Sequence, residues 1–177
     1  MMAVVGVEGA GAATVAGAVQ VEALFRSEYP GLVRLASLLL GDVAASEEVV
    51  QDAFVRLQLD RGRIREPAKA PAWLRSVVLN GARSRLRRRA VRRRSPEPVP
   101  GTVPSAETGA LAQDEHRRVV AALRRLPVRQ REALALRFYL DLSEEATAAA
   151  MGVSAGSVKT HVHRGLATLA PMLREER

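Results

Sequence analysis

The sequence of 177 residues has no cysteine and only three histidines. A chain without cysteine forms no disulfide framework and no thiolate metal site, and this composition fits a reducing cytoplasm. The few histidines also argue against a metal enzyme. No carboxylate pair, Ser-His-Asp set or metal-ligand cluster can be recognised. We therefore expect a cytoplasmic protein that has no catalytic residues, no metal, no cofactor and no enzymatic activity.

Long apolar runs are also missing. No window reaches the roughly eighteen unbroken apolar residues that a membrane-spanning helix needs. The first 20 residues are rich in Ala, Gly and Val, but no Lys or Arg occurs before Arg26, so they lack the positive start of a secretory signal. We expect residues 1–20 to form a flexible N-terminal tail and the protein not to insert into membranes.

Strand signals are scarce, whereas helical periodicity recurs, which predicts an all-α fold. The first expected helix carries an apolar face, and Pro30 either kinks or divides it. The residues of this face are Phe25, Tyr29, Leu32, Ala36 and Leu39. A second helix begins near Ala45, a loop covers residues 59–71, and a third helix begins near Ala72.

Proline, glycine, serine and threonine dominate residues 95–109, which predicts a linker. We therefore expect two small helical domains, at residues 21–94 and 113–177, joined by a proline-rich linker at 95–112. The second domain should contain four helices, with Val119, Leu123 and Leu126 facing inward.

Basic residues outnumber acidic ones by 27 to 19, which gives a net charge of +8 and favours a polyanionic partner. The excess is concentrated in residues 83–94, where eight of twelve residues are arginine. These arginines repel one another unless phosphates are nearby, so we favour contact with a nucleic-acid backbone. A solubilising tail is the alternative.

The second expected helix has an acidic outer face, which is notable in a basic protein. Its members are Glu47, Glu48, Gln51 and Asp52. This face is either an ordinary solvated helix side or a docking surface for a basic protein partner. The residues alone leave both interpretations open.

Residues 142–165 read as a helix-turn-helix. Ser143 can cap a short helix, Gly152 can end it in the left-handed conformation, and Ser154 can cap a second helix from about Ala155. The second helix carries an expected apolar stripe of Val158, Val162 and Leu166. Its opposite face offers short donors and cations that suit phosphates and base edges, namely Ser157, Lys159, Thr160, His161, His163 and Arg164. An ordinary helical hairpin is the alternative.

Two blocks together resemble the extracytoplasmic-function sigma factors, small bacterial transcription initiation factors. Residues 25–57 and 72–82 look like sigma region 2, with the runs FRSEYPGLVRLA, ASEEVVQDAFVRL and AWLRSVVLNGA. The run LRRLPVRQREA at 123–133 and the helix-turn-helix after it look like sigma region 4. The resemblance covers roughly residues 21–171, in the family's order and without a region 3.

The resemblance implies binding of core RNA polymerase and promoter DNA, and makes an anti-sigma factor a candidate partner. It implies that the polymerase clamp binds Glu48, Gln51 and Asp52. The -10 element would be melted and read by Asn80, Arg83, Ser84 and Arg87. The -35 element would be read by the donor face of the helix-turn-helix. His161 and His163 depart from the residues that the family often has there, and Gln58 replaces a frequent tryptophan.

Two alternatives to a sigma factor remain, one in the same functional area and one from another class. A helix-turn-helix repressor or activator would bind duplex DNA alone and would not need the acidic face around Asp52. A non-specific basic nucleic-acid-binding protein would use the arginine run without sequence preference, with steep salt dependence.

Overall fold

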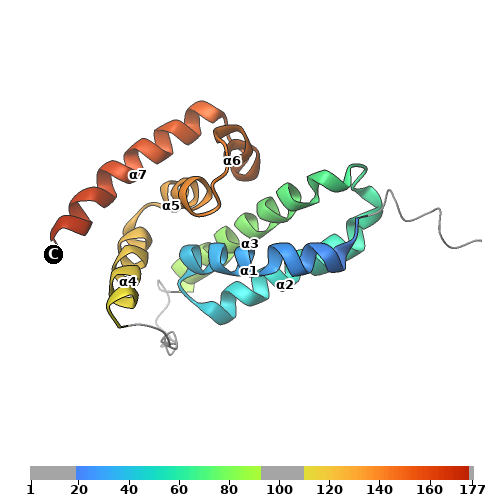
Figure 1. Cartoon of the computed structure of the whole chain (residues 1–177), viewed down its shortest axis with the longest axis horizontal. Helices are drawn as coiled ribbons and strands as arrows, with labels where there is room; N and C mark the ends of the chain where they lie inside the picture. The colour runs from blue at the N-terminus through green and yellow to red at the C-terminus, as the bar shows by residue number, and fades with distance from the viewer. Residues whose placement is uncertain (1–18, 93–109, 176–177) are drawn as a thin grey trace, which may run out of the picture.

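The computed structural model describes residues 19–92 and 110–175, and within them every regular element is a helix (Figure 1). Most of the expected tail and linker therefore lies outside the described residues. The order of elements is α1 (Val21–Leu40), α2 (Val43–Asp60), η1 (Arg61–Arg63), η2 (Pro67–Lys69), α3 (Ala70–Arg92), α4 (Ala110–Arg125), α5 (Val128–Leu134), η3 (Ala135–Tyr139), α6 (Glu144–Met151) and α7 (Ala155–Glu175). The all-α prediction is confirmed.

Helices α1, α2 and α3 pack against one another lengthwise (Figure 1). Pro30 does not divide α1, which continues to Leu40. A proline removes one backbone hydrogen bond, but Leu32, Leu35 and Leu39 are fully buried on the far side of it. Burial of these side chains holds the helix together past the proline. Val19, assigned to the tail in the sequence analysis, is buried as well.

The helix-turn-helix forms with the expected caps. The Ser143 hydroxyl accepts a hydrogen bond from the Ala146 amide at 3.1 Å, and Gly152 ends α6 with φ 68°. The Ser154 hydroxyl accepts from the Ser157 amide at 3.2 Å in the first turn of α7. Sequence and local structure agree here because caps are local interactions.

One detail of the α7 stripe was predicted wrongly. Leu166 is 43% exposed, whereas Gly165 is buried and Leu169 half-buried. A residue seven positions after Val158 lies about 20° from it around the helix, while one eight positions later lies about 80° away. The inward face therefore continues through Gly165, whose lack of a side chain lets Leu134 of α5 come close.

The buried side chains of the first three helices and of α5–α7 form one continuous hydrophobic cluster. Leu79 of α3, Leu136 of η3 and Met151 of α6 all belong to it. Helices α3 and α6 pack against each other, and α4 contacts the end of α1. The C-terminal helices therefore lie directly against the N-terminal ones.

Asp42 provides a test of how α2 begins. Its carboxylate accepts a hydrogen bond from the Ala45 amide at 3.0 Å and pairs with Arg89 at 2.5 Å. We expect Asp42→Ala to lower the free energy of unfolding by about 1–2 kcal/mol at neutral pH. Asp42→Asn is the matched control, because its side-chain oxygen can still cap the helix. Urea unfolding would measure both variants.

The same residue predicts a pH dependence. The amide of Ala45 chiefly lowers the pKa of Asp42 below its usual 3.8, with Arg89 adding to the effect against partial desolvation. A carboxyl whose pKa is lowered on folding stabilises the protein above its unfolded value, and that stabilisation is lost as the pH falls through the folded value. The difference between wild type and Asp42→Ala should therefore shrink below pH 3.8. A difference that persists unchanged in acid would contradict this role.

Candidate nucleic-acid interface

The outer face of α7 gathers the donors expected to read duplex DNA. Lys159, Thr160, His163 and Arg164 are exposed, and Ser157 and His161 are partly exposed. These residues lie on one helix whose opposite side packs on α5 and α6. The outer side of α7, the second helix of the helix-turn-helix, is therefore accessible to a major groove of DNA.

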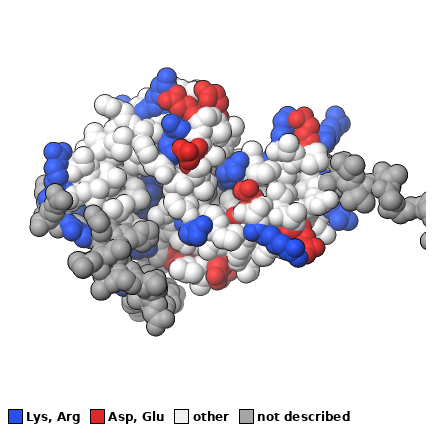
Figure 2. Space-filling view, in the orientation of Figure 1, with Lys and Arg blue, Asp and Glu red and all other residues white. Residues whose placement is uncertain are grey.

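Some of these side chains already have local partners. The Lys159 ammonium lies 3.4 Å from the Glu144 carboxylate at the start of α6. The Thr160 hydroxyl donates to the Gly156 carbonyl at 3.0 Å, and the Ser157 hydroxyl lies 2.9 Å from that of Ser154. In the orientation of Figure 1, acidic and basic side chains are interspersed over the visible surface rather than separated into two regions (Figure 2). DNA binding through Lys159 would therefore exchange one anionic partner for another.

The residues expected to read the -10 element lie along α3. Asn80 and Arg87 are exposed, while Arg83 and Ser84 are partly buried. Arg87 donates to the Ser84 hydroxyl at 3.0 Å, and Arg83 donates to the Asn80 side-chain oxygen at 2.8 Å. The structure thus brings these residues together on α3, but it also gives Arg83 a second set of partners.

Arg83 makes a two-fold ion pair with Glu132 of α5. Its Nε lies 2.6 Å from Oε1 of the carboxylate, and Nη2 lies 2.8 Å from Oε2. Glu132 is fully buried, and it also accepts from Arg129 at 3.1 Å. Both arginines donate to the Met151 carbonyl as well, at 3.3 and 3.1 Å. They thereby cap the C-terminal end of α6, where cations are favourable.

Other members of the arginine run are paired within the chain too. Arg85 pairs with Glu48 and donates to the Ala45 carbonyl, and Arg89 pairs with Asp42. Phosphates are therefore not needed to offset every positive charge of this run. Arg87, Arg88 and Arg92 are exposed and are accessible to the phosphates of a nucleic-acid backbone.

The acidic face of α2 is exposed, as expected. Glu48, Gln51 and Asp52 all lie on the solvent side, and Val55 beside them is 58% exposed. The side chain of Glu48 is 60% exposed although it contacts Arg85. Because the Glu48 carboxylate stays exposed while it pairs with Arg85, it can form an ion pair with a second cation.

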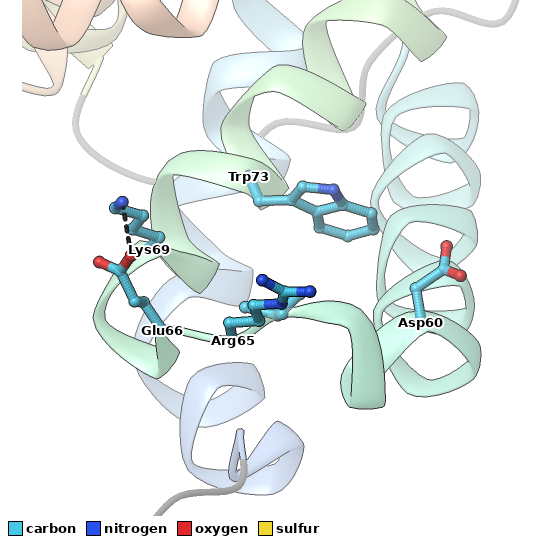
Figure 3. A pocket seen from close by; sticks show the side chains of 6 residues that line it. Asp60, Arg65, Glu66, Lys69 and Trp73 are labelled. Carbon is cyan, nitrogen blue, oxygen red and sulfur yellow. Dashed lines mark hydrogen bonds and ion pairs between the residues drawn. The ribbon is translucent and has the colours of Figure 1, made fainter.

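The segment between α2 and α3 forms a surface hollow of about 410 Å³. Its lining residues are Asp60, Ile64, Arg65, Glu66, Lys69 and Trp73. In Figure 3 the Trp73 ring reaches from α3 across the hollow, and Arg65 lies below it. Lys69 pairs with Glu66 at 2.9 Å on the rim. The aromatic face suits an unstacked base, and Arg65 and Lys69 suit its phosphates, although Asp60 and Glu66 line the same hollow and offset their charge.

Neither this hollow nor the cluster around Glu132 was predicted from the sequence. Arg65 and Lys69 lie in the segment 59–71, which was expected to be a loop and for which no site residues were predicted. Glu132 and Arg83 are 49 residues apart in the sequence. No local sequence pattern relates positions so far apart. The hollow could have been predicted, because a tryptophan follows a charged segment that contains proline.

Within residues 19–92 and 110–175, no group of His, Asp and Glu is arranged to hold a metal ion. In the same described part of the chain, no helix is long and apolar enough to cross a membrane.

Two family descriptions match the chain in the order that the sequence suggested. "Sigma-70 region 2" matches residues 24–92, and "Sigma-70, region 4" matches residues 116–169. The first covers the hollow and the -10 candidates of α3, and the second covers the helix-turn-helix. A chain with both regions argues against a repressor that carries the helix-turn-helix alone.

Two curated relatives support the same family. The chain is 31% identical to the RNA polymerase sigma-E factor of Streptomyces avermitilis, over 84% of this chain and 82% of the relative. It is 33% identical to the ECF RNA polymerase sigma factor SigM of Mycobacterium tuberculosis, over 85% of this chain and 75% of that protein.

The fold resembles the sigma factor RpoE of Bartonella quintana, solved with the anti-sigma factor NepR. The TM-score is 0.72 at 24% identity, over 88% of this chain and 98% of that one. CnrH, solved with the cytosolic domain of CnrY, gives a TM-score of 0.68 at 24% identity, over 89% of each chain. The fold, the two matched regions and the relatives lead to one conclusion: the chain belongs to the sigma-70 family, in its extracytoplasmic-function group of transcription initiation factors.

Proposed function

We propose that this protein directs core RNA polymerase to promoters through three separate surfaces. The outer face of α7 reads the -35 element as duplex through Ser157, Lys159, Thr160, His161, His163 and Arg164. Helix α3 and the hollow beside it hold the melted -10 element, with Asn80, Arg83, Ser84 and Arg87. The outer face of α2 binds the polymerase through Glu48, Gln51 and Asp52.

The observation that carries this proposal is the presence of two surfaces of different character in one chain. The α7 face is a helix surface with short donors and cations, which suits a groove of duplex DNA. The hollow combines the Trp73 ring with Arg65 and Lys69, which suits a single strand whose bases are unstacked. A protein that both selects and opens a promoter needs both kinds of surface.

Several further parts of the proposal rest on family membership. The protein works in the cytoplasm, performs no covalent chemistry and needs no cofactor. An anti-sigma factor is a candidate partner, because the structurally similar RpoE was solved in complex with the anti-sigma factor NepR.

Transcription in vitro tests the function. Purified core polymerase would be incubated with a library of genomic fragments, with and without this protein, and the transcript starts mapped. We expect new starts that appear only with the protein and share two upstream elements. Tight DNA binding by the protein alone with no new starts would instead support a repressor or nucleoid protein.

The hollow has a direct optical readout, because Trp73 is the only tryptophan of the chain. We expect single-stranded -10 DNA to quench its fluorescence, since stacking brings a base against the indole ring. Anisotropy of fluorescein-labelled DNA measures the variants, because a chain without Trp73 has no tryptophan signal. In that assay Arg65→Ala and Trp73→Leu should weaken binding, the latter by about 1–3 kcal/mol. Trp73→Phe is the matched control that keeps an aromatic face. Duplex -35 DNA should leave the fluorescence unchanged, and equal quenching by both DNAs would refute the assignment.

A further inference from the structure

Two of the three histidines of the chain, His161 and His163, lie on α7 within the face proposed to contact the -35 element. His163 is exposed and His161 is partly exposed. Within residues 19–92 and 110–175, neither imidazole makes a hydrogen bond or an ion pair. Histidine is the side chain whose charge ordinarily changes between about pH 5 and 8. The α7 face thus contains two groups that can gain a positive charge without losing an internal partner.

The two histidines lie on opposite edges of this face. At about 100° per residue, each lies about 80° around the helix from the middle of the Thr160–Arg164 pair, in opposite directions. Thr160 and Arg164 are both exposed, and the fully buried Val158 lies on the far side of the helix. The outer face therefore has a hydroxyl and a guanidinium at its centre and one imidazole at each edge.

The width of a major groove gives these edges a different partner from the centre. An α-helix with its side chains is about 10–12 Å across, and the major groove of B-DNA is about 12 Å wide. A helix that enters the groove nearly fills it, with its centre against the base edges and its two edges toward the phosphates of the two strands. A protonated imidazole donates from both ring nitrogens and carries a charge, which suits a phosphate.

Each histidine has a cation one turn away on the same helix. His163 lies one turn after Lys159, whose ammonium is 3.4 Å from the Glu144 carboxylate of α6. His161 lies three residues before Arg164, and side chains at this spacing are neighbours on a helix. A phosphate beside either edge therefore meets an existing positive charge, which one proton on the imidazole doubles.

The other charges near α7 titrate outside the range of histidine. Carboxylates ordinarily titrate near about pH 4, and lysine and arginine above about pH 10. Its own backbone amide chiefly lowers the pKa of Glu145 below its usual 4.5, and the Ser143 hydroxyl adds to this. Helices α4 and α5 contact the opposite, apolar side of α7, around Leu123, Leu134 and Leu169. The histidines are therefore the groups of this face whose charge changes between about pH 6 and 8.

We propose that His161 and His163, in their protonated form, each hold the phosphate backbone of one DNA strand, so that duplex binding takes up protons. Thr160 and Arg164 contact the base edges between them. A phosphate favours the charged imidazole, so the affinity rises as the pH falls and levels off once the free protein is itself protonated. The inference rests on the proposed role of α7 in binding duplex DNA, and it assigns to that face a control by pH.

Anisotropy of a rhodamine-labelled duplex of 20 base pairs and mixed sequence tests the proposal, because phosphate contacts do not depend on sequence. We expect the full chain to bind about tenfold more tightly at pH 6 than at pH 8. His161→Gln with His163→Gln should remove this difference, and each single variant should remove part of it. His116→Gln, which changes the histidine of α4, is the matched control and should retain it. A double variant with the pH dependence of the wild type would overturn the proposal.

The salt dependence distinguishes phosphate contacts from other effects of protonation. Each added phosphate contact should steepen the slope of log affinity against log salt by about 0.9. We therefore expect a steeper slope at pH 6 than at pH 8 for the wild type and equal slopes for the double variant. A wild-type slope that is the same at both pH values would overturn the assignment to phosphates.

A variant with fixed charges keeps the test decisive if the glutamine variants fold poorly. His161→Arg with His163→Arg should bind at pH 8 as tightly as the wild type does at pH 6, and it should lose the pH dependence. Weaker binding by this variant than by the wild type at pH 8 would contradict the proposal. Absence of new transcript starts with core polymerase would reject the proposed function, whereas the pH dependence of duplex binding decides on the histidines alone.

Discussion

Replacing Glu48 and Asp52 together by lysine should abolish association with core RNA polymerase while the helical content is kept. Both side chains are exposed on the outer face of α2, away from the buried Val50 and Leu57. Reversing two charges in a complementary interface replaces attraction by repulsion, and we expect a loss of at least about 3 kcal/mol of binding free energy. Co-purification and titration with labelled protein would measure it.

Two controls separate docking from effects within the chain. Glu48 pairs with Arg85, so Glu48→Lys also disturbs a contact between α2 and α3. Arg85→Ala breaks that same pair without changing the charge of α2, and it should retain polymerase binding. Glu22→Lys reverses a charge that is 79% exposed on α1. The docking assignment fails if the double variant still binds, or if Glu22→Lys loses binding equally.

The second large effect is expected on α7. Lys159→Ala and Arg164→Ala should each reduce transcription from promoters with an intact -35 element. If the side chain reads a base, the loss corresponds to about 1–3 kcal/mol of binding free energy. Lys159 already has Glu144 at 3.4 Å, so its contribution is the difference between two anionic partners. We therefore expect Arg164→Ala to have the larger effect. Transcription assays on matched templates would measure both.

The control for α7 is Arg174→Ala, which removes an exposed arginine near the end of the same helix. It should leave the preference for the -35 sequence intact. A side chain that contacts only phosphate should weaken binding equally on all sequences and lower the salt dependence by about one unit of slope. If Lys159→Ala and Arg164→Ala lose equal activity on intact and scrambled -35 elements, these side chains contact the DNA backbone and do not read bases.

Local signals in the sequence were sufficient for most of the fold. Ser143, Gly152 and Ser154 marked the helix-turn-helix because caps depend on residues within one turn. Leu32, Ala36 and Leu39 are buried as periodicity predicts, whereas Phe25 of the same expected face is 42% exposed. The error at Leu166 arose from extending a four-residue step twice, although the inward face returns after seven residues.

Contacts between distant segments could not be predicted in the same way. The pairs Arg83–Glu132, Arg85–Glu48 and Arg89–Asp42 join residues that are 49, 37 and 47 positions apart. The arginine run was interpreted as unpaired because the sequence shows charges but not the carboxylates that fold against them. Charge composition thus predicted a polyanionic partner but not which arginines are already engaged.

The hollow beside Trp73 could be predicted from the sequence only in part. Trp73 is partly buried and packs against the hydrophobic cluster. The structure shows that it also lines the hollow with Arg65. One side chain serves both purposes because a large ring can be anchored on one face and exposed on the other.

The most direct test of the central claim is transcription from one mapped promoter on four templates. They carry both elements intact, a scrambled -10, a scrambled -35, and five base pairs inserted between the elements, which is about half a helical turn. If one chain reads both elements within one polymerase complex, only the intact template should be transcribed at full rate. Equal transcription from the intact and inserted templates would contradict that claim.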